Sequence, residues 1–299
     1  MKVKLFLFSL LPFLSLANII LFSQQKIIVP PPVDALSNYQ HPSIPKLTSN
    51  NLPILLRSPN YIVVDSATNT ILLAQNSHQK IFPASITKLA TALTALNVYP
   101  LDELITVKQA YTEGKVMELK IGEKITVQSL VSALLVYSAN DAAFTLANHH
   151  TGGIDGFINQ MNLLAQKYQL TDTHFVNYDG IHHPEHFSTV YDLSQLGRLA
   201  LKNPIVKQTV KQKNLTVTDI DNTISHQLSS TNELLGLVPE IEGIKTGWTP
   251  EAGGCFISLL NLDGHYLISV VAQSEDRFAD TLKILNWAKR NIIWSDYQP

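Results

Sequence analysis

The sequence predicts an α+β protein in which one antiparallel sheet is built from both ends of a domain, flanked by helices, with a helical lobe inserted between the two ends. Strand-like apolar runs occur soon after residue 60 and again after residue 254, and the sequence between them has mostly helical periodicity. With 299 residues, of which 45% are hydrophobic, the chain can bury a large core. Its net charge of −2 gives no basic face, so we expect no nucleic-acid partner.

The chain begins with a membrane-targeting pattern. Lys2 and Lys4 precede an apolar run from Leu5 to Phe22, and basic residues before such a run keep that end in the cytoplasm, so the remainder is exported. Residues 1–22 are expected to be a signal peptide or an N-terminal membrane anchor, because the run has both a small-residue cleavage pattern and roughly the length of a spanning helix. The Pro-rich stretch 23–52 predicts an extracytoplasmic linker.

The folded domain is predicted to cover residues 53–299 and to start with two strands. Tyr61–Asp65 and Ile71–Ala74 are apolar runs separated by polar turn residues. A helix is predicted after Pro83, because leucines at 89, 93 and 96 fall on one face. Helical composition and periodicity continue through three further segments: Ser129–His149, Gly156–Tyr168 and Val190–Lys202.

Strands return near the end of the chain. Cys255–Leu260 and Tyr266–Ala272 flank Asn261–Gly264, whose Asp-Gly pair suits a tight hairpin turn. A last helix is predicted over about Arg277–Arg290. The single cysteine, Cys255, excludes an intramolecular disulfide and a Cys-based zinc site, and its apolar flanks predict a buried residue.

A serine and a lysine lie three residues apart at the start of the helix after Pro83. On a helix this spacing places the Lys88 amine beside the Ser85 hydroxyl. Serine is a poor nucleophile without an adjacent base, and a desolvated lysine can be that base. The helix N-terminus adds positive potential for an oxyanion. By itself the pair has a second interpretation, a helix cap with a surface lysine.

Two further motifs come later in the chain, in the order expected for a serine acyl-enzyme site. Ser138-Ala139-Asn140 is a Ser-x-Asn element, and Lys245-Thr246-Gly247 completes the set that accompanies Ser-x-x-Lys in penicillin-recognising enzymes. Each has a structural interpretation too, since Ser138 could cap a helix and Lys245-Thr246-Gly247 could be a turn before a strand. The three together favour one active site.

The chain resembles the serine D-Ala-D-Ala carboxypeptidases, the low-molecular-mass penicillin-binding proteins of peptidase family S11. The resemblance runs from about Tyr61 to about Trp287. It extends beyond the three motifs to Thr173-His174-Phe175-Val176-Asn177 with Gly180, and to Gly243–Thr249 with Glu251-Ala252-Gly253. It implies the β-lactamase/transpeptidase-like fold.

The resemblance also implies a role for each matching residue. Ser85 would attack the penultimate D-Ala carbonyl of a peptidoglycan stem peptide, Lys88 would be its base, and Ser138 would pass a proton to the leaving amine. Substrate-binding roles are implied for Asn140, Lys245, Thr246, Gly247 and Trp248. Lys245 and Thr246 would receive the free carboxylate, and the backbone N–H groups of Ser85 and Trp248 would form the oxyanion hole.

The partners implied by this resemblance are peptidoglycan stem peptides ending in D-Ala-D-Ala and, as inhibitors, β-lactam antibiotics. No cofactor and no metal are implied, and the location would be the outer face of a bacterial plasma membrane, or the medium if the leader is cleaved. The chain stops at Pro299, shortly after Trp287, so membrane attachment would fall to the N-terminal segment.

Three alternatives remain beside carboxypeptidase activity. A D,D-endopeptidase acting on cross-links would share every motif. A class A β-lactamase would need a glutamate-activated water, and no Glu-x-x-Leu-Asn occurs after Asn140. A non-catalytic wall-binding module would not need all the motif side chains. One departure from the family is Tyr178-Asp179, where Pro or His is more usual, and this could alter substrate fit.

Other polar residues have less specific patterns. The run His182-His183-Pro184-Glu185-His186 contains metal-ligand residue types, but a proline-containing loop does not fix two histidines on one helical face, so a solvated loop near the cleft is the expectation. Asp65, Asp141 and Asp192 are interpreted as capping or otherwise satisfied polar residues.

Overall fold

The central sheet draws its strands from both ends of the domain. The computed structural model describes residues 42–48 and 53–295. Within these ranges five strands form a sheet in the order β3-β2-β10-β9-β8, and every neighbouring pair is antiparallel. The strands are β2 (Asn60–Asp65), β3 (Ile71–Gln75), β8 (Ile241–Thr249), β9 (Gly253–Leu262) and β10 (His265–Ser274). The predicted α+β class and the sheet built from both ends are confirmed.

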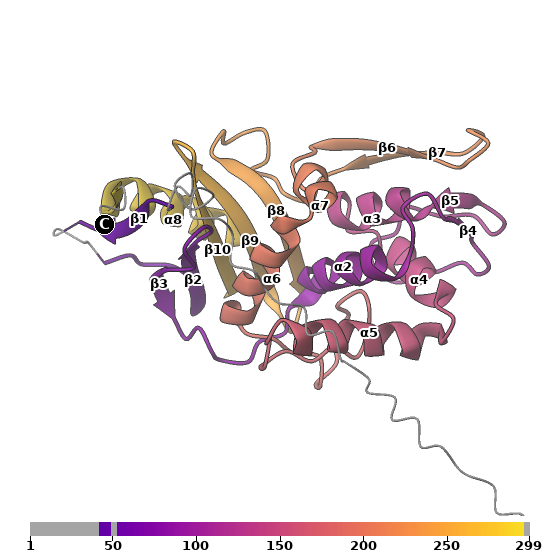
Figure 1. Cartoon of the computed structure of the whole chain (residues 1–299), viewed down its shortest axis with the longest axis horizontal. Helices are drawn as coiled ribbons and strands as arrows, with labels where there is room; N and C mark the ends of the chain where they lie inside the picture. The colour runs from indigo at the N-terminus through magenta and orange to yellow at the C-terminus, as the bar shows by residue number, and fades with distance from the viewer. Residues whose placement is uncertain (1–41, 49–52, 296–299) are drawn as a thin grey trace, which may run out of the picture. The chain divides into compact units, whose positions relative to one another are not determined.

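Alternating side chains of the sheet face two different cores. Tyr61 and Val63 of β2 pack with Trp287 and its neighbours in α8 (Arg277–Asn291), whereas Ile62 and Val64 pack with the other helices. Because successive residues of a strand point to opposite faces, a fully buried strand such as β2 indicates a sheet covered on both sides. Figure 1 shows α8 on one face and α6 (Val190–Lys202) on the other.

The β9–β10 hairpin closes through the predicted turn. Asp263 has φ 53° and Gly264 has φ 89°, which are the positive values that a two-residue type I′ turn requires at both central positions. The turn thereby fixes the register that pairs Leu262 with His265.

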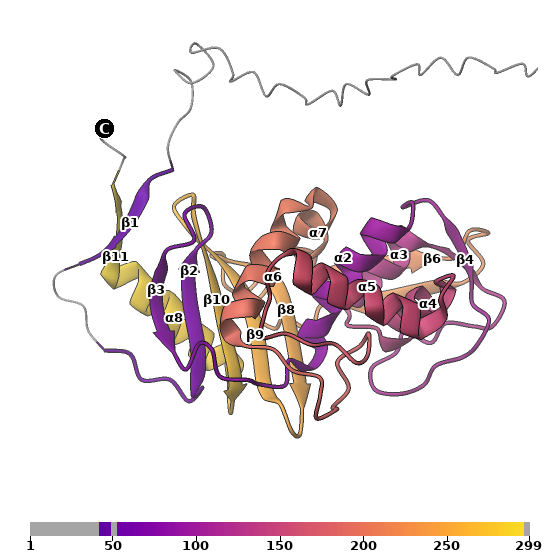
Figure 2. The same cartoon turned by 60° about the horizontal axis from the view of Figure 1, so that its bottom comes forward.

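A helical lobe fills the chain between β3 and β8, as Figure 2 shows. It contains the short 3₁₀ helix η1 (Ala84–Thr87), α2 (Lys88–Val98), α3 (Val127–Val136), α4 (Asn140–His149), α5 (Gly153–Lys167) and α7 (Pro204–Thr209), as well as α6. The helical segment predicted over Ser129–His149 is two helices. Tyr137–Ala139 separate them, and Ser138 has φ 69°, which a continuing α-helix does not allow.

Three two-stranded ribbons were not predicted from the sequence. They are β4 (Leu104–Thr106) with β5 (Lys124–Thr126), β6 (Asn214–Thr218) with β7 (Ser225–Ser229), and β1 (Ile44–Leu47) with β11 (Ile292–Ser295). The strands are three to five residues long and lack a sustained apolar pattern. β1 falls inside the stretch expected to be a linker, yet it pairs with β11 along all four of its residues.

The predicted leader, residues 1–22, lies outside the described residues, as do 23–41, 49–52 and 296–299. Of the helices in the described part of the chain, none combines the length and the apolar character needed to cross a bilayer.

Candidate active site

The Ser85 hydroxyl and the Lys88 amine are in hydrogen-bond contact at the junction of η1 and α2. Lys88 Nζ lies 3.0 Å from Ser85 Oγ and donates to the Asp179 carbonyl oxygen at 2.7 Å. Lys88 is fully buried, and Ser85 is half-buried. The three-residue spacing therefore places the two groups together as predicted, and the alternative of a surface lysine is wrong.

The backbone before Ser85 is held in an unusual conformation. Ala84 has φ 48°, a region that non-glycine residues rarely adopt. Gly180 is packed against this peptide so closely that a Cβ at Gly180 would lie 1.9 Å from the Ala84 carbonyl oxygen. Contact with the Gly180 turn therefore accompanies a backbone conformation that is costly for alanine.

The burial of Lys88 tunes its amine toward neutrality. Desolvation lowers the pKa of Lys88 to about 8, although the carboxylates of Asp179 and Asp141 oppose this shift by favouring the charged form. A lysine with this pKa is partly neutral near physiological pH, so its lone pair is available to accept a proton from Ser85.

Ser138 lies in the turn between α3 and α4, and Asn140 is the first residue of α4. Ser138 is buried, and its hydroxyl makes no hydrogen bond to Ser85 or Lys88 within the described chain. Ser138 does not cap α4, since the N-cap is Ala139 and has no side-chain cap bond. Asn140 is fixed from the facing segment: its Nδ2 donates to Glu113 O at 3.0 Å and its backbone N to Lys115 O at 2.7 Å.

Lys245 and Thr246 belong to β8, which is one of the two edge strands of the five-stranded sheet. Lys245 is 1% exposed, and its Nζ donates to Thr246 O at 3.1 Å. Burial lowers the pKa of Lys245 well below the usual lysine value, and the positive charges of Lys88, Lys115 and Arg277 add to this effect. The motif lies within a nine-residue strand, so its interpretation as a turn is wrong.

Gly247 allows β8 to lie directly against the backbone of the serine. A Cβ at Gly247 would be 2.9 Å from Ser85 N and 3.1 Å from Pro83 O, so only glycine fits without displacing η1. The next residue, Trp248, is 60% exposed. The first and third motifs are thus linked: β8 contacts the Ser85 backbone, and the charge of Lys88 acts on Lys245. The second motif is linked through Asp141, the residue after Asn140, whose carboxylate acts on Lys88.

Several polar groups at the site were not identified from the sequence. Thr231 Oγ1 lies 2.6 Å from Thr246 Oγ1. Arg277 packs against Gly254, the strand partner of Trp248, and its buried Nε has no hydrogen-bond partner in the described part of the chain. Both reach the site from segments far from the motifs in sequence, so local spacing gave no signal for either.

The expected solvated loop is exposed from His182 to Glu185 but not at His186, where the expectation is wrong because the ring packs inside the protein. His186 is buried, with Nε2 2.8 Å from Thr87 Oγ1 and Nδ1 accepting from Val176 N at 3.2 Å. Burial, together with three neighbouring histidines and Lys88, lowers the pKa of His186 to about 3, so the ring stays neutral. Across the described residues no three His, Cys, Asp or Glu side chains cluster as metal ligands.

Asp65, Asp141 and Asp192 accept hydrogen bonds from nearby donors. Asp65 binds Thr68 N at 2.8 Å, Asp141 binds Met117 N and Leu119 N, each at 3.0 Å, and Asp192 binds Thr173 Oγ1 at 2.7 Å. Their interpretation as satisfied polar residues is confirmed. Cys255 is buried as predicted, and burial raises the pKa of its thiol to about 11.

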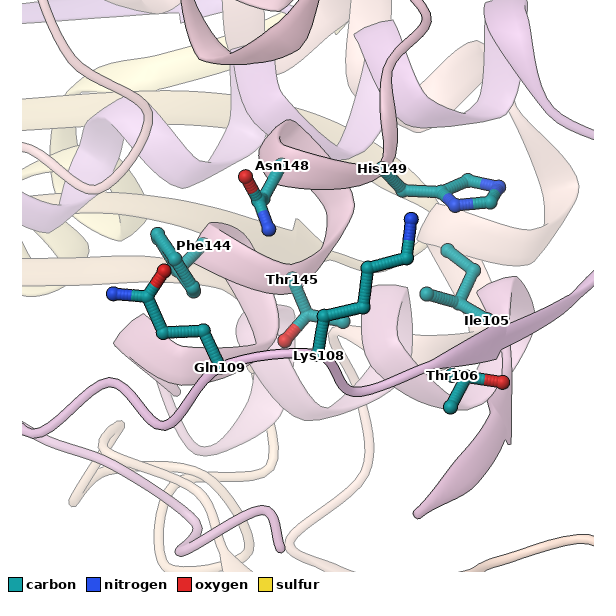
Figure 3. A pocket seen from close by; sticks show the side chains of 8 residues that line it. All are labelled: Ile105, Thr106, Lys108, Gln109, Phe144, Thr145, Asn148 and His149. Atoms are coloured by element: carbon teal, nitrogen blue, oxygen red, sulfur yellow. The ribbon is translucent and has the colours of Figure 1, made fainter. Parts of the chain in front are cut away.

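A separate surface hollow lies beside α4, away from the three motifs. Figure 3 shows that its wall is formed by the segment around β4 on one side and by α4 on the other. It is lined by Ile105, Thr106, Lys108, Gln109, Phe144, Thr145, Asn148 and His149. None of these residues belongs to a motif, so the hollow contributes no group to the chemistry described above.

Comparison with known proteins gives one consistent family. The family described as D-alanyl-D-alanine carboxypeptidase, peptidase S11, matches residues 47–276. A D-alanyl-D-alanine carboxypeptidase of Escherichia coli is 30% identical over 267 residues, which are 82% of this chain and 67% of the relative. A D-alanyl-D-alanine endopeptidase of Pseudomonas aeruginosa is 28% identical over 80% of this chain and 79% of its own length.

Among solved structures, a Streptomyces DD-transpeptidase is similar with a TM-score of 0.75 and 28% sequence identity. The match covers 79% of this chain and 98% of that structure. The similarity therefore takes in nearly the whole of the solved protein.

Proposed function

The chain belongs to peptidase family S11, the D-alanyl-D-alanine carboxypeptidases, and from this premise we propose that it removes the terminal D-Ala from peptidoglycan stem peptides through a Ser85 acyl-enzyme. The observation that carries the proposal is the 3.0 Å contact between Ser85 Oγ and the fully buried amine of Lys88. A nucleophile and its base within hydrogen-bond reach are the minimum that acyl transfer requires.

Acylation depends on the positions of these groups. Neutral Lys88 accepts the proton of Ser85 as its Oγ attacks the carbonyl carbon of the penultimate D-Ala. We assign the stabilisation of the negative charge on the carbonyl oxygen to the backbone N–H groups of Ser85 and Trp248. This assignment is supported by the close approach of Gly247, the residue before Trp248, to Ser85 N. The tetrahedral intermediate then expels the amine of the terminal D-Ala, which receives a proton through Ser138. A water molecule hydrolyses the ester and regenerates Ser85.

A positive field selects substrates with a free carboxylate. The positive charges of Lys115 and Arg277 lie close enough to Lys245 to lower its pKa. We assign the terminal carboxylate to this region, with the Thr246 hydroxyl as an additional donor and the Asn140 amide bound to the peptide backbone. Burying an anion here would relieve the repulsion among the three cations.

The chemistry also fits the alternative of a D,D-endopeptidase, the activity named for the Pseudomonas relative. A cross-link and a stem peptide differ in the group on the leaving side of the scissile bond. Peptidoglycan digestion products resolve the two: release of free D-Ala from pentapeptides supports the carboxypeptidase, and cleavage of dimeric peptides alone supports the endopeptidase.

The decisive test is the intact mass of the protein before and after benzylpenicillin, a β-lactam that mimics the D-Ala-D-Ala end. We expect a lasting penicilloyl adduct on the unaltered protein and none on Ser85→Ala, because only the alkoxide of Ser85 can open the lactam. An adduct that persists in Ser85→Ala would overturn the assignment of the nucleophile. Intact drug and no adduct would favour the non-catalytic module, and hydrolysed drug without an adduct would indicate a β-lactamase.

We further propose an extracytoplasmic location, with residues 1–22 as a leader or anchor. Support comes from the basic-then-apolar N-terminal pattern and from the location of the proposed substrate outside the plasma membrane. Protease protection in intact spheroplasts tests this, since an exported domain is digested and a cytoplasmic one is protected.

A further inference from the structure

The side chain of Asp179 is buried between the catalytic lysine and a segment on the opposite side of the site. Asp179 is 2% exposed, and its backbone carbonyl is the one that accepts from Lys88 Nζ at 2.7 Å. Its carboxylate accepts from Ile181 N at 3.1 Å and from the Tyr111 hydroxyl at 2.8 Å. The bond to Ile181 closes a small turn and fixes the direction of the carbonyl that binds Lys88.

Tyr111 is held rigidly by aromatic neighbours. Its ring is stacked on Phe144 of α4 with centroids 5.0 Å apart, and it meets Tyr178 edge-on at 6.2 Å. Burial and the neighbouring Asp179 carboxylate raise the pKa of Tyr111 far above the usual range, so the phenol stays protonated and donates to Asp179.

The segment that begins at Tyr111 also holds Asn140. Two and four residues after Tyr111, the carbonyls of Glu113 and Lys115 accept from the side chain and backbone of Asn140. The Tyr111–Asp179 hydrogen bond therefore joins the turn that binds Lys88 to the segment that binds Asn140. No motif residue lies in this connection.

We propose that Tyr111 and Asp179 are a positioning pair that keeps Lys88 and Asn140 in register across the active site, with Asp179 also supplying negative charge toward Lys88. This inference rests on the proposed function and deepens it, because it assigns roles to two residues outside the motifs. Neither side chain needs to touch the substrate. Both act through residues that do.

The charged surroundings of Lys88 decide what removing Asp179 will do. Asp179 and Asp141 favour the protonated amine, Lys245 on β8 is coupled to Lys88 by repulsion, and His186 is neutral. Without the charge of Asp179, Lys88 loses its proton at lower pH. Acylation needs neutral Lys88, so its rate in the unaltered protein should rise with pH through about 8.

Asp179→Asn separates charge from geometry, because the amide oxygen can still accept from Ile181 N while the amide NH2 group donates to the Tyr111 hydroxyl oxygen. We expect the acidic limb of the acylation profile to move to lower pH by about one pH unit, the effect of losing one nearby opposite charge. Tyr111→Phe has the complementary effect, since it keeps the ring and the carboxylate and removes the link. We expect acylation by benzylpenicillin to slow by about tenfold, with no shift of the limb to lower pH.

Matched controls exist for both variants. Asp192→Asn removes another buried carboxylate that is bound to Thr173, and Tyr99→Phe removes another part-buried phenol, which donates to Leu146 O at 3.0 Å. Neither Asp192 nor Tyr99 hydrogen-bonds to the Asp179 turn that binds Lys88. Both controls should leave the pH of the limb unchanged and the acylation rate within about twofold of the unaltered protein.

The first measurement is the rate of acylation by benzylpenicillin from about pH 6 to about pH 10 in the unaltered full chain and the four variants. The second is the NMR titration of ¹³C-labelled lysine in the same proteins, with Lys88→Met used to assign the Lys88 signal. If Asp179→Asn moves both the acidic limb of the acylation profile and the NMR titration of Lys88 to lower pH, the result supports the proposed charge role of Asp179. If both curves of Asp179→Asn coincide with those of the unaltered protein, Asp179 does not act on Lys88 through its charge, and this part of the proposal is overturned.

Equal acylation rates in Tyr111→Phe and Tyr99→Phe overturn the positioning role, and this comparison decides the matter if Asp179→Asn does not fold. If the unaltered protein is not acylated at any pH, the proposed function fails. The Lys88 titration then still tests whether Asp179 acts on the lysine, because it needs no substrate.

Discussion

Two glycines bring the backbones around Ser85 closer together than other residues would allow. Gly247 brings β8 against Ser85 N, and Gly180 brings the Asp179 turn against Ala84 O. The carbonyl that binds Lys88 and the strand that carries Lys245 both depend on these approaches. At the residue scale, the geometry of the site therefore depends on the two glycines, which have no side chain, as well as on the polar side chains.

Gly180→Ala tests this dependence. Gly180 has φ 86° and no room for a Cβ, whereas Gly236 has a similar φ of 80° and nothing within 4 Å. We expect Gly236→Ala to lower the free energy of unfolding by about 1 kcal/mol, the cost of a left-handed alanine. Gly180→Ala should lower it by about 2–4 kcal/mol, because overpacking adds to that cost, and should reduce penicillin acylation.

Urea unfolding of both variants gives the comparison, with acylation rates measured under folding conditions. If the two substitutions lower stability equally, the close approach at Gly180 has no energetic weight. If a folded Gly180→Ala protein is acylated as fast as the unaltered protein, the function of Lys88 does not depend on the exact position of the Asp179 turn.

The sequence predicted the residues of the site where the signal is local. Ser85 and Lys88 meet because three-residue spacing on a helix fixes their relation, whatever the remainder of the fold. Tyr111, Thr231 and Arg277 reach the site through packing between segments that are distant in sequence, which no local pattern encodes. Asp179 was noted as a departure from the family, but its bond to Tyr111 required the fold.

At the scale of elements, a buried histidine–glutamate contact joins the β6–β7 ribbon to the segment that holds Asn140. His226 of β7 places Nε2 2.8 Å from Glu123 Oε1, and its Nδ1 lies 2.8 Å from Met117 O. Both ring nitrogens therefore lie within hydrogen-bond reach of an oxygen of that segment. The ribbon thereby supports the segment from 113 to 123 from outside the site.

Removing one partner of this pair should destabilise the protein strongly. His226→Ala leaves Glu123, whose side chain is 0% exposed, as a buried charge without its partner, and we expect a loss of about 3 kcal/mol in the free energy of unfolding. The control is Lys289→Ala, which breaks the exposed pair with Glu240 and should cost less than about 1 kcal/mol. Similar losses in urea unfolding for both variants would contradict a supporting role for the buried pair.

Long apolar elements were predictable and short ribbons were not. The strands and helices of the sheet layer carry apolar patterns over several residues, as in β10 with its buried run from Leu267 to Ala272. β4, β5, β6 and β7 each bury only one or two side chains. Their pairing depends on neighbours supplied by the helical lobe, so the sequence of each strand alone carries too little signal.

At the scale of the whole molecule, both ends of the described chain meet on the same side of the sheet. β1 and β11 form a ribbon, and Trp294 of β11 stacks on His265 with centroids 4.5 Å apart while its Nε1 donates to Asp65 Oδ2 at 3.0 Å. The chain folds into a compact unit from Pro42 onward. The predicted domain start at residue 53 would leave β11 without its strand partner.

Two truncated proteins measure what the β1–β11 ribbon contributes. One begins at Pro42 and keeps β1, and the other begins at Pro53 and loses it. We expect the shorter protein to melt about 2–4 °C lower, because a loss of roughly 1 kcal/mol shifts the melting temperature by that amount for a domain of this size. Acylation by benzylpenicillin should be equal in both, since Ser85 and Lys88 lie in the helical lobe and make no contact with the ribbon. Identical melting temperatures would mean that β1 adds no stability, and slower acylation in the shorter protein would mean that the ribbon influences the active site through the sheet.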